Sequence, residues 1–334
     1  MNPLAGWIVF FEIDNLSTIS FCHKLKNMTT GIKHNLIKEQ PKIVDNKTFR
    51  DETLKDTPLT NEVYANCKFY SCILSAPLLE KVRFVNCVLH DCEIERSTLW
   101  HVVFANCQLE RTSFICSTLS SCKFIKCSLT DCDFGKGTIH ELRIIQTRLT
   151  RCDIIDIIGE AHNISLIQCY LEEVHFRNSS LQGFKVVATT FKNSQFFRCA
   201  WQSSDIGSTI FDSCDINELQ LDKVHVGETM FLRSTFTHCS FGERIRLLQV
   251  TFSDSFIVEC SFLNTRIFDK IIVSPFTDVT AVTEGSGGII STPPTQTNSN
   301  TAVKSTKVEN ESKAHFYCSV GLFTKKPATQ LAIN

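Results

Sequence analysis

The sequence of 334 residues lacks most of the features that direct a protein to a particular partner or compartment. Its 34 Lys and Arg residues nearly balance its 35 Asp and Glu residues, so no charge of one sign attracts nucleic acid or an anionic membrane. The opening MNPLAGWIVFFEIDN has an apolar run but no basic region before it, and no stretch supplies the roughly 20 apolar residues of a transmembrane helix. We therefore expect a cytoplasmic protein that contacts neither nucleic acid nor membrane.

Motifs for catalysis and cofactor binding are also missing. The chain contains no P-loop, GxGxxG, HExxH or GxSxG motif, and no CxxC or paired Cys/His pattern. The histidines of the central region are scattered over outward positions, and no two of them are expected to share a column with a carboxylate. We expect no catalytic residue, no cofactor and no metal site, and so a protein that is not an enzyme.

What the sequence does contain is a beat of five residues. Every fifth residue is large and apolar, with a slip of two residues in IDIIGEAHNIS (155–165) and a slip of one in GERIR (242–246). We call this residue the centre of its five-residue unit, and about forty units follow one another. The centres form three series, Tyr64 to Ile154, Leu166 to Phe241 and Leu247 to Ile267.

A second regularity accompanies the centres. The residue two places earlier, which we call the inner residue, is mostly cysteine, serine or threonine, as in CKFIKCSLTDCDF (122–134). Residues two apart on an extended chain point to the same side, so the centre and the inner residue both face inward. The other two residues turn the chain, and four units close a square coil of 20 residues. Asn66, Asn86 and Asn106 recur at that spacing, where a corner needs a residue that tolerates unusual φ.

This pattern resembles the pentapeptide-repeat proteins, whose consensus is A(D/N)LXX. The segments ANCQL (105–109), SSCKF (120–124) and TDCDF (130–134) fit it, with cysteine where the consensus favours alanine. The resemblance implies an all-β fold, a right-handed quadrilateral β-helix of about ten coils. It says little about activity, because one fold serves many functions. Similar Cys- and Phe-rich coils occur in the luminal loop of synaptic vesicle glycoproteins, but this chain lacks the surrounding transporter and we do not extend their function to it.

Fourteen of the 17 cysteines are inner residues, and we interpret them as packing. A column of thiols one coil apart, such as Cys67, Cys87 and Cys107, does not converge on one point as zinc ligands must. Parallel Cβ vectors also disfavour the dihedral angle of a disulfide. The exceptions are Cys22, Cys116 and Cys318.

Three functions are compared on these grounds. The preferred hypothesis is a non-catalytic interaction scaffold built on a rigid β-helical rod. The first alternative is a DNA mimic that inhibits a nucleic-acid enzyme, as some acidic pentapeptide-repeat rods do; residues 61–270 hold 21 Lys and Arg against 24 Asp and Glu, which is a weak negative field for that role. A β-helical carbohydrate-active enzyme is less favoured still, because the long loops that build a groove are missing.

One column of residues favours a partner. The residue after each centre, which we call the trailing residue, is apolar along the side that begins at Tyr64, whereas other sides carry charges such as Glu110, Lys192 and Asp212 there. We expect this apolar stripe to bind a protein partner or a second copy, unless the residues are partly buried or the chain's own flanks cover them. Its members are Ala65, Val85, Ala105, Ile125, Ile145, Ile167, Val187, Leu248 and Phe268, with Gly207 and Gly227 between Val187 and Leu248.

The sequence divides into three parts. Residues 1–60 lack the beat and form a non-repeat segment, a linker or a cap for the open end of the rod, with Leu4 to Phe11 as the capping run and some helix expected between Phe21 and Glu39. Residues 61–270 form the β-helix. Residues 271–334 are rich in Thr, Ser, Gly and Asn and are expected to be a low-complexity, disordered tail.

Overall fold

The fold comes from a computed structural model of the chain. It describes residues 40–54, 58–75, 78–157, 159–242, 244–262, 266–267, 271–273, 278–280 and 283–284. Residues 1–40 and 41–334 form separate units, and the strands belong to the second. The expected cap, the expected helix before Glu39 and most of the expected tail lie outside the described residues.

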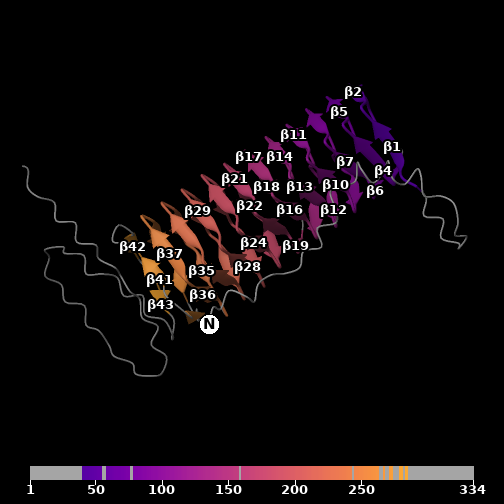
Figure 1. The fold of residues 1–334 in the computed structure, drawn as a ribbon. Coiled ribbons are helices and arrows are strands. Elements are labelled where there is room, and N and C mark those ends of the chain that lie inside the picture. The colour runs from indigo at the N-terminus through magenta and orange to yellow at the C-terminus, as the bar shows by residue number, and fades with distance from the viewer. Residues whose placement is uncertain are drawn as a thin grey trace, which may run out of the picture. The chain divides into compact units, whose positions relative to one another are not determined.

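Four parallel sheets form the four sides of the coiled chain. Successive coils stack on one another from the indigo end of the chain to the orange end in Figure 1. Sheet A consists of β1 (Lys42–Asp45), β4 (Glu62–Ala65), β7 (Arg83–Val85), β10 (Val103–Ala105), β13 (Lys123–Ile125), β16 (Arg143–Ile145), β20 (Ser165–Ile167), β24 (Lys185–Val187), β28 (Asp205–Gly207), β32 (His225–Gly227), β36 (Arg246–Leu248) and β40 (Arg266–Ile267). Sheet B consists of β2 (Thr48–Arg50), β5 (Lys68–Tyr70), β8 (Val88–His90), β11 (Gln108–Glu110), β14 (Ser128–Thr130), β17 (Arg148–Thr150), β21 (Tyr170–Glu172), β25 (Thr190–Lys192), β29 (Ile210–Asp212), β33 (Met230–Leu232), β37 (Val250–Ser253) and β41 (Ile271–Val273).

The other two sides complete each coil. Sheet C consists of β18 (Asp153–Ile155), β22 (His175–Arg177), β26 (Gln195–Phe197), β30 (Asp215–Asn217), β34 (Thr235–Thr237), β38 (Phe256–Val258) and β42 (Asp278–Thr280). Sheet D consists of β3 (Leu59–Thr60), β6 (Leu78–Glu80), β9 (Thr98–Trp100), β12 (Thr118–Ser120), β15 (Thr138–His140), β19 (Glu160–His162), β23 (Ser180–Gln182), β27 (Ala200–Gln202), β31 (Gln220–Asp222), β35 (Ser240–Phe241), β39 (Ser261–Phe262) and β43 (Thr283–Glu284). The predicted all-β quadrilateral coil is confirmed.

The register follows the beat of five. Phe84, Phe104 and Phe124 are Cα partners on successive strands of sheet A, 20 residues apart. The first slip lengthens this step to 22 residues, since Ile144 pairs with Leu166. Both predicted slips are confirmed, because the second lengthens the step to 21 residues on β32 and β36.

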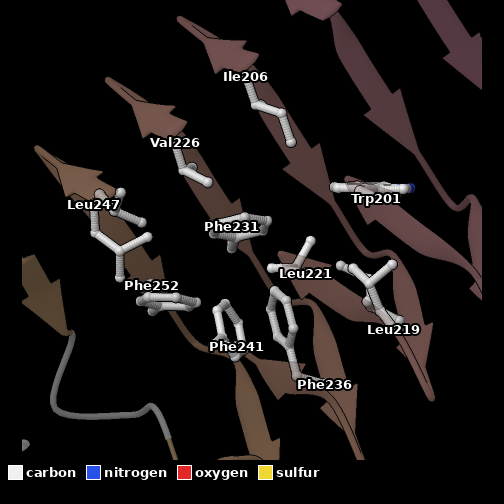
Figure 2. Close-up of a pocket in the computed structure, with 12 residues that line it drawn as sticks. Trp201, Ile206, Leu219, Leu221, Val226, Phe231, Phe236, Phe241, Leu247 and Phe252 are labelled. Carbon is white, nitrogen blue, oxygen red and sulfur yellow. The ribbon is translucent and has the colours of Figure 1, made fainter. Parts of the chain in front are cut away.

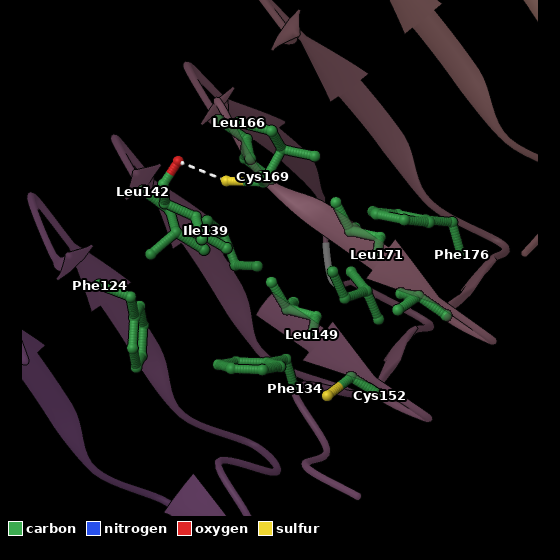
Figure 3. Packing of buried hydrophobic residues seen from close by; sticks show 14 of the residues in the cluster. Phe124, Phe134, Ile139, Leu142, Leu149, Cys152, Leu166, Cys169, Leu171 and Phe176 are labelled. Atoms are coloured by element: carbon green, nitrogen blue, oxygen red, sulfur yellow. Dashed lines mark hydrogen bonds between the residues drawn. The ribbon is translucent and has the colours of Figure 1, made fainter. Parts of the chain in front are cut away.

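Centres and inner residues fill one continuous core. Tyr64, Phe84, Phe104 and Phe124 stack face to face with ring centroids 4.8 to 5.2 Å apart. Figure 3 shows the core across the first slip, where Phe124, Phe134, Leu149 and Leu171 point to the inside. Such stacking along the axis is available only because a parallel register places each ring directly over its counterpart one coil away.

The corners that the structure describes use a left-handed backbone. The corner residue, two places after the centre, has a φ of about +54° at Asn66, Asn86 and Asn106, as predicted. The same conformation recurs at corners occupied by Lys126 or Glu141, where it carries strain. The coil offsets that strain with backbone pairing: the N–H of Asn66 donates to the carbonyl of Val85 one coil on, at 2.9 Å.

The coil begins earlier and ends later than predicted. Strand β1 pairs with β4, so the boundary at residues 60 and 61 is wrong, and strands continue to Glu284 beyond residue 270. The first coil does keep the beat, with Val44, Phe49 and Leu54 partly buried against the core. It escaped notice because three of its inner residues are the charged Lys42, Lys47 and Glu52 rather than small ones.

Candidate interaction surface

The interior holds no constellation that suggests chemistry. A cavity of about 20 Å³ lies between the later coils, and only apolar side chains line it, including Ile206, Val226, Leu247 and Phe231 (Figure 2). In the part of the chain that the structure describes, no group of three or more His, Cys, Asp or Glu residues is placed to hold a metal ion. The surface of the coil is therefore where a function has to be sought.

The cysteines behave as core residues. All fourteen inner cysteines are free and buried, whereas Cys116 is exposed at a corner. Each thiol donates to backbone carbonyls; Cys169, for example, donates to the carbonyl of Ile144 at 3.2 Å, the dashed line in Figure 3. Burial raises the pKa of the Cys122 and Cys199 thiols to about 11. Their burial in the core confirms the interpretation of the inner cysteines as packing residues.

In the structure the apolar stripe runs along the C-terminal ends of the strands of sheet A, from β4 to β36. Its described members are Cα partners from strand to strand, so the column runs unbroken through ten coils. In order these are Ala65, Val85, Ala105, Ile125, Ile145, Ile167, Val187, Gly207, Gly227 and Leu248, while Phe268 lies outside the described residues.

The stripe is less exposed than a surface column would be. Its aliphatic members are half-buried, apart from Ala105, which is buried, and Leu248, which is 44% exposed. Trailing residues on sheet B, such as Glu110 and Lys192, are half-buried as well. Partial burial is thus a property of the trailing position. What distinguishes sheet A there is its lack of polar groups from β4 to β36, since only β1 carries a charge, Asp45, among its described trailing residues.

A column of cations lies beside the stripe, and the sequence analysis missed it. The leading residue, one place before the centre, also points outward. On six consecutive strands of sheet A it is Arg83, Val103, Lys123, Arg143, Ser165 and Lys185, in one register. The signal was available, because these residues lie 20 residues apart once the slip of two is allowed for.

These cations are accessible and unneutralised. Arg83, Arg143 and Lys185 are exposed, and Lys123 is half-buried. Among the described residues none of the four makes an ion pair. Asp205, the next leading residue after Lys185, ends the column. The nearby corners add two cations, Lys126 and Lys81, of which Lys81 pairs with Glu80 at 2.7 Å, and one carboxylate, Glu141, which accepts a hydrogen bond from Ser121.

On sheet B, by contrast, charged side chains pair with one another. Glu172 accepts from both Arg148 and Lys192, at 2.8 and 3.2 Å. At the corners that follow sheet B, Arg151 and Asp131 pair across successive coils at 2.7 Å. The hydrogen bond from Arg151 lowers the pKa of the Asp131 carboxyl. Charges on sheet B therefore cancel locally, whereas those of sheet A remain available to a partner.

The side opposite sheet A has an acidic character in its first coils. Its leading residues there include Glu93, Asp133 and Asp153. Burial raises the pKa of the Asp133 carboxyl, and Asp153 and Glu95 add to the rise, against the hydrogen bond from the Gly135 N–H. Asp153 also meets His175 on the neighbouring strand, whose Nδ1 lies 2.8 Å from its Oδ1.

The comparisons with known proteins concern the fold of the chain and not its function. A family profile described as the SV2A/B/C luminal domain matches residues 39–134, less than a third of the chain. No curated protein matches the chain. Within the described residues, no helix has the length and apolar character that a membrane crossing requires.

Several solved structures are similar at low identity. HetL, a pentapeptide repeat protein involved in heterocyst differentiation regulation from the cyanobacterium Nostoc, is 11% identical over 60% of this chain and 84% of its own, with a TM-score of 0.24. QnrB1, a plasmid-mediated fluoroquinolone resistance protein, is 11% identical over 73% of this chain and 92% of its own, with a TM-score of 0.34. The catalytic unit of an α-1,3-glucanase from Streptomyces thermodiastaticus is 8% identical over 73% of this chain and 59% of its own, with a TM-score of 0.35.

Identities of 8 to 11% and TM-scores below 0.5 carry no function over to this chain. The fold rests instead on the chain's own geometry. Its five-residue period, its four-sided parallel coil and its small inner residues are those of the pentapeptide-repeat fold that the sequence predicts.

Proposed function

We propose that this chain is a non-catalytic interaction scaffold that binds a protein partner on sheet A. One observation carries the proposal: the trailing column of sheet A has no polar side chain from Ala65 to Leu248. Its members keep part of their surface open, and together they offer a straight apolar line many coils long. Extended apolar surface of this kind is typical of protein interfaces.

The neighbouring charges also favour sheet A as the binding surface. A protein interface combines an apolar centre with a polar rim, and the exposed cations Arg83, Arg143 and Lys185 border the stripe. A rigid coil with its interior sealed by Phe and Cys side chains also presents this surface without a cost of ordering on binding.

A DNA mimic is the weaker alternative. Such a surface needs negative charge at close intervals, since duplex DNA carries one charge per about 1.7 Å. The carboxylates of the side opposite sheet A are separated by Ser113 and partly occupied by His175. We therefore favour the scaffold.

A double variant on the stripe tests the proposal. Ile125→Asp with Ile145→Asp places two carboxylates in the stripe, and the matched control, Thr130→Asp with Thr150→Asp, places them at the trailing positions of sheet B in the same two coils. We expect the stripe variant to lose the proteins that the wild-type chain captures from its source cells, as identified by mass spectrometry. The sheet B variant should retain them, and both should keep the wild-type circular dichroism. Equal capture by the two variants would refute the proposal.

A further inference from the structure

The cation column of sheet A, which consists of Arg83, Lys123, Arg143 and Lys185, is unusual within this molecule. Lys123 and Arg143 are Cα partners on β13 and β16, so two like charges stand directly beside each other. Like charges opposite one another on neighbouring strands destabilise a sheet. Sheet B shows that this coil can place a carboxylate next to a cation, as at the Cα partners Glu172 and Lys192. Among the described residues Lys123 and Arg143 have no such partner, and this has a cost in the isolated chain.

The chain's own flanks do not supply the missing negative charge. Residues 1–39 contain four Lys and three Asp or Glu residues, and residues 285–334 contain five Lys and two Glu residues. Both flanks carry a net positive charge, so the column repels rather than attracts them. An occupant with excess negative charge is therefore sought in another molecule.

We infer that sheet A binds an acidic amphipathic helix of a protein partner, with carboxylates on the cation column and apolar side chains on the stripe. This inference rests on the proposed function and specifies the partner's chemistry. The two columns of sheet A lie side by side, one on each side of the centres, so a ligand must present a negative column next to an apolar one. A uniform polyanion such as duplex DNA has no counterpart to the stripe.

The axial spacing also fits a helix. Successive coils lie about 4.8 Å apart, which is close to the 5.4 Å pitch of an α-helix, so residues one turn apart meet successive coils. Arg83 to Lys185 spans five coil steps, about 24 Å, or roughly 16 helical residues. Because Val103 and Ser165 interrupt the cations, carboxylates about six or seven residues apart would meet Arg83 and Lys123, or Arg143 and Lys185, and carboxylates three or four apart would meet Lys123 and Arg143.

A defined peptide tests the inference with the full chain. The probe is a labelled helical peptide of about 16 residues with Glu in one stripe and Leu in the next, and its control carries Lys in place of Glu. Binding is followed by fluorescence anisotropy at about 50 mM and about 500 mM salt. The variant Lys123→Glu with Arg143→Glu reverses two column charges, and Lys68→Glu with Lys136→Glu makes the same change in net charge on exposed positions of other sides.

We expect the Glu peptide to bind the wild-type chain at low salt and to weaken at high salt, because exposed charges are screened. Reversing Lys123 and Arg143 should lower its affinity by about tenfold or more, whereas the control variant should bind like the wild type. Binding of the Lys peptide should be negligible.

Several results would overturn the inference. They are no binding of the Glu peptide at low salt, equal binding by both variants, or tighter binding of a 20-base-pair DNA duplex with the same dependence on Lys123 and Arg143. Self-association in sedimentation that the column variant abolishes, without peptide binding, would assign the surface to a second copy. If the stripe variant loses captured proteins but the column variant keeps them, the scaffold stands and only the acidic partner fails.

Discussion

The coils before the first slip and the coils after it have the same fold but fill their inner positions with different side chains. Up to Cys152, nine buried inner residues are cysteine and four are serine or threonine; from Cys169 on, five are cysteine and eight are serine or threonine. A thiol donates weakly to nearby carbonyls. A hydroxyl both donates and accepts, as Ser204 does when it receives the Phe184 N–H at 3.1 Å and donates to the Gln202 carbonyl at 2.9 Å.

The two regions also differ in the side opposite sheet A and in where the aromatic rings lie. Before the slip this side is joined only by isolated bridges such as Ser113 to Asp133, and after it by the three-residue strands of sheet C. The long aromatic stack moves from sheet A to sheet B, where it includes Phe191, Phe211 and Phe231. The five-residue period thus determines the path of the backbone, whereas the side chains that fill the core vary. The luminal-domain profile matches only residues 39–134, within the thiol-rich region.

The largest effect should come from removing an aromatic ring in each region. Phe104→Ala deletes a ring held between Phe84 and Phe124 at 4.9 and 4.8 Å, and we expect a loss of about 4 to 5 kcal/mol in the free energy of unfolding. Phe231→Ala should cost nearer 3 kcal/mol, because Phe231 already borders the cavity. Urea denaturation followed by circular dichroism measures both. An equal or reversed order would show that the two regions are packed alike.

A smaller effect separates hydroxyl from thiol. Ser204→Ala leaves the buried N–H of Phe184 without its acceptor, and we expect a cost of about 1 to 3 kcal/mol. Cys107→Ala removes only packing and a weak donor, for about 1 kcal/mol. Thermal unfolding of the two variants provides the comparison, with Ser204→Cys as the control that keeps the shape of the side chain but replaces the hydroxyl by a weak acceptor. A Ser204→Cys chain as stable as the wild type would remove the distinction between the regions.

The path of the chain could be predicted from the sequence because every unit repeats it. A period of five is incompatible with a helix or a flat strand, and the apolar centres and small inner residues left one solution, down to the left-handed corner at Asn66. The prediction failed where the pattern thins out. The first coil keeps its centres but places Lys47 and Glu52 at inner positions, and it was therefore taken for a linker.

The surface was harder to predict than the interior. Apolarity along one column was visible, but its half-buried state depends on how the trailing position lies against the corner. The cations of sheet A were not predicted. A nucleic-acid-binding column would have basic residues interleaved with aromatic ones, whereas Arg143 and Lys185 stand beside aliphatic residues. That they are unpaired is a property of distances between side chains, which a periodic sequence does not reveal.

Filling the cavity should stabilise the later coils slightly. Val226 lines the cavity, so Val226→Ile adds a methylene where about 20 Å³ is empty, and we expect a gain of about 0.5 to 1 kcal/mol. Val186 lies two strands away in sheet A and is fully buried without lining that cavity, so Val186→Ile should instead cost about 1 to 3 kcal/mol through overpacking. Melting temperatures of the two variants decide the matter. Destabilisation by both would mean that the later coils are as tightly packed as the earlier ones.

The smallest effect depends on pH and concerns the acidic side of the early coils. Because burial and the nearby Asp153 and Glu95 raise the pKa of Asp133, the folded chain holds this proton at a higher pH than the unfolded chain does. Stability then falls as pH rises from about 4, the ordinary carboxyl value, through the raised pKa.

Asp133→Asn removes that dependence and keeps the acceptor of the Gly135 N–H. We expect the variant to melt above the wild type at pH 7 and level with it below about pH 4, where Asp133 is protonated in both states. Asp215→Asn, at the corresponding leading position of β30 and exposed, should show no such crossover in a pH series of melting temperatures. A pH-independent gain at Asp133 would point to packing rather than charge, and the contrast between the two regions would then lie wholly in the interior.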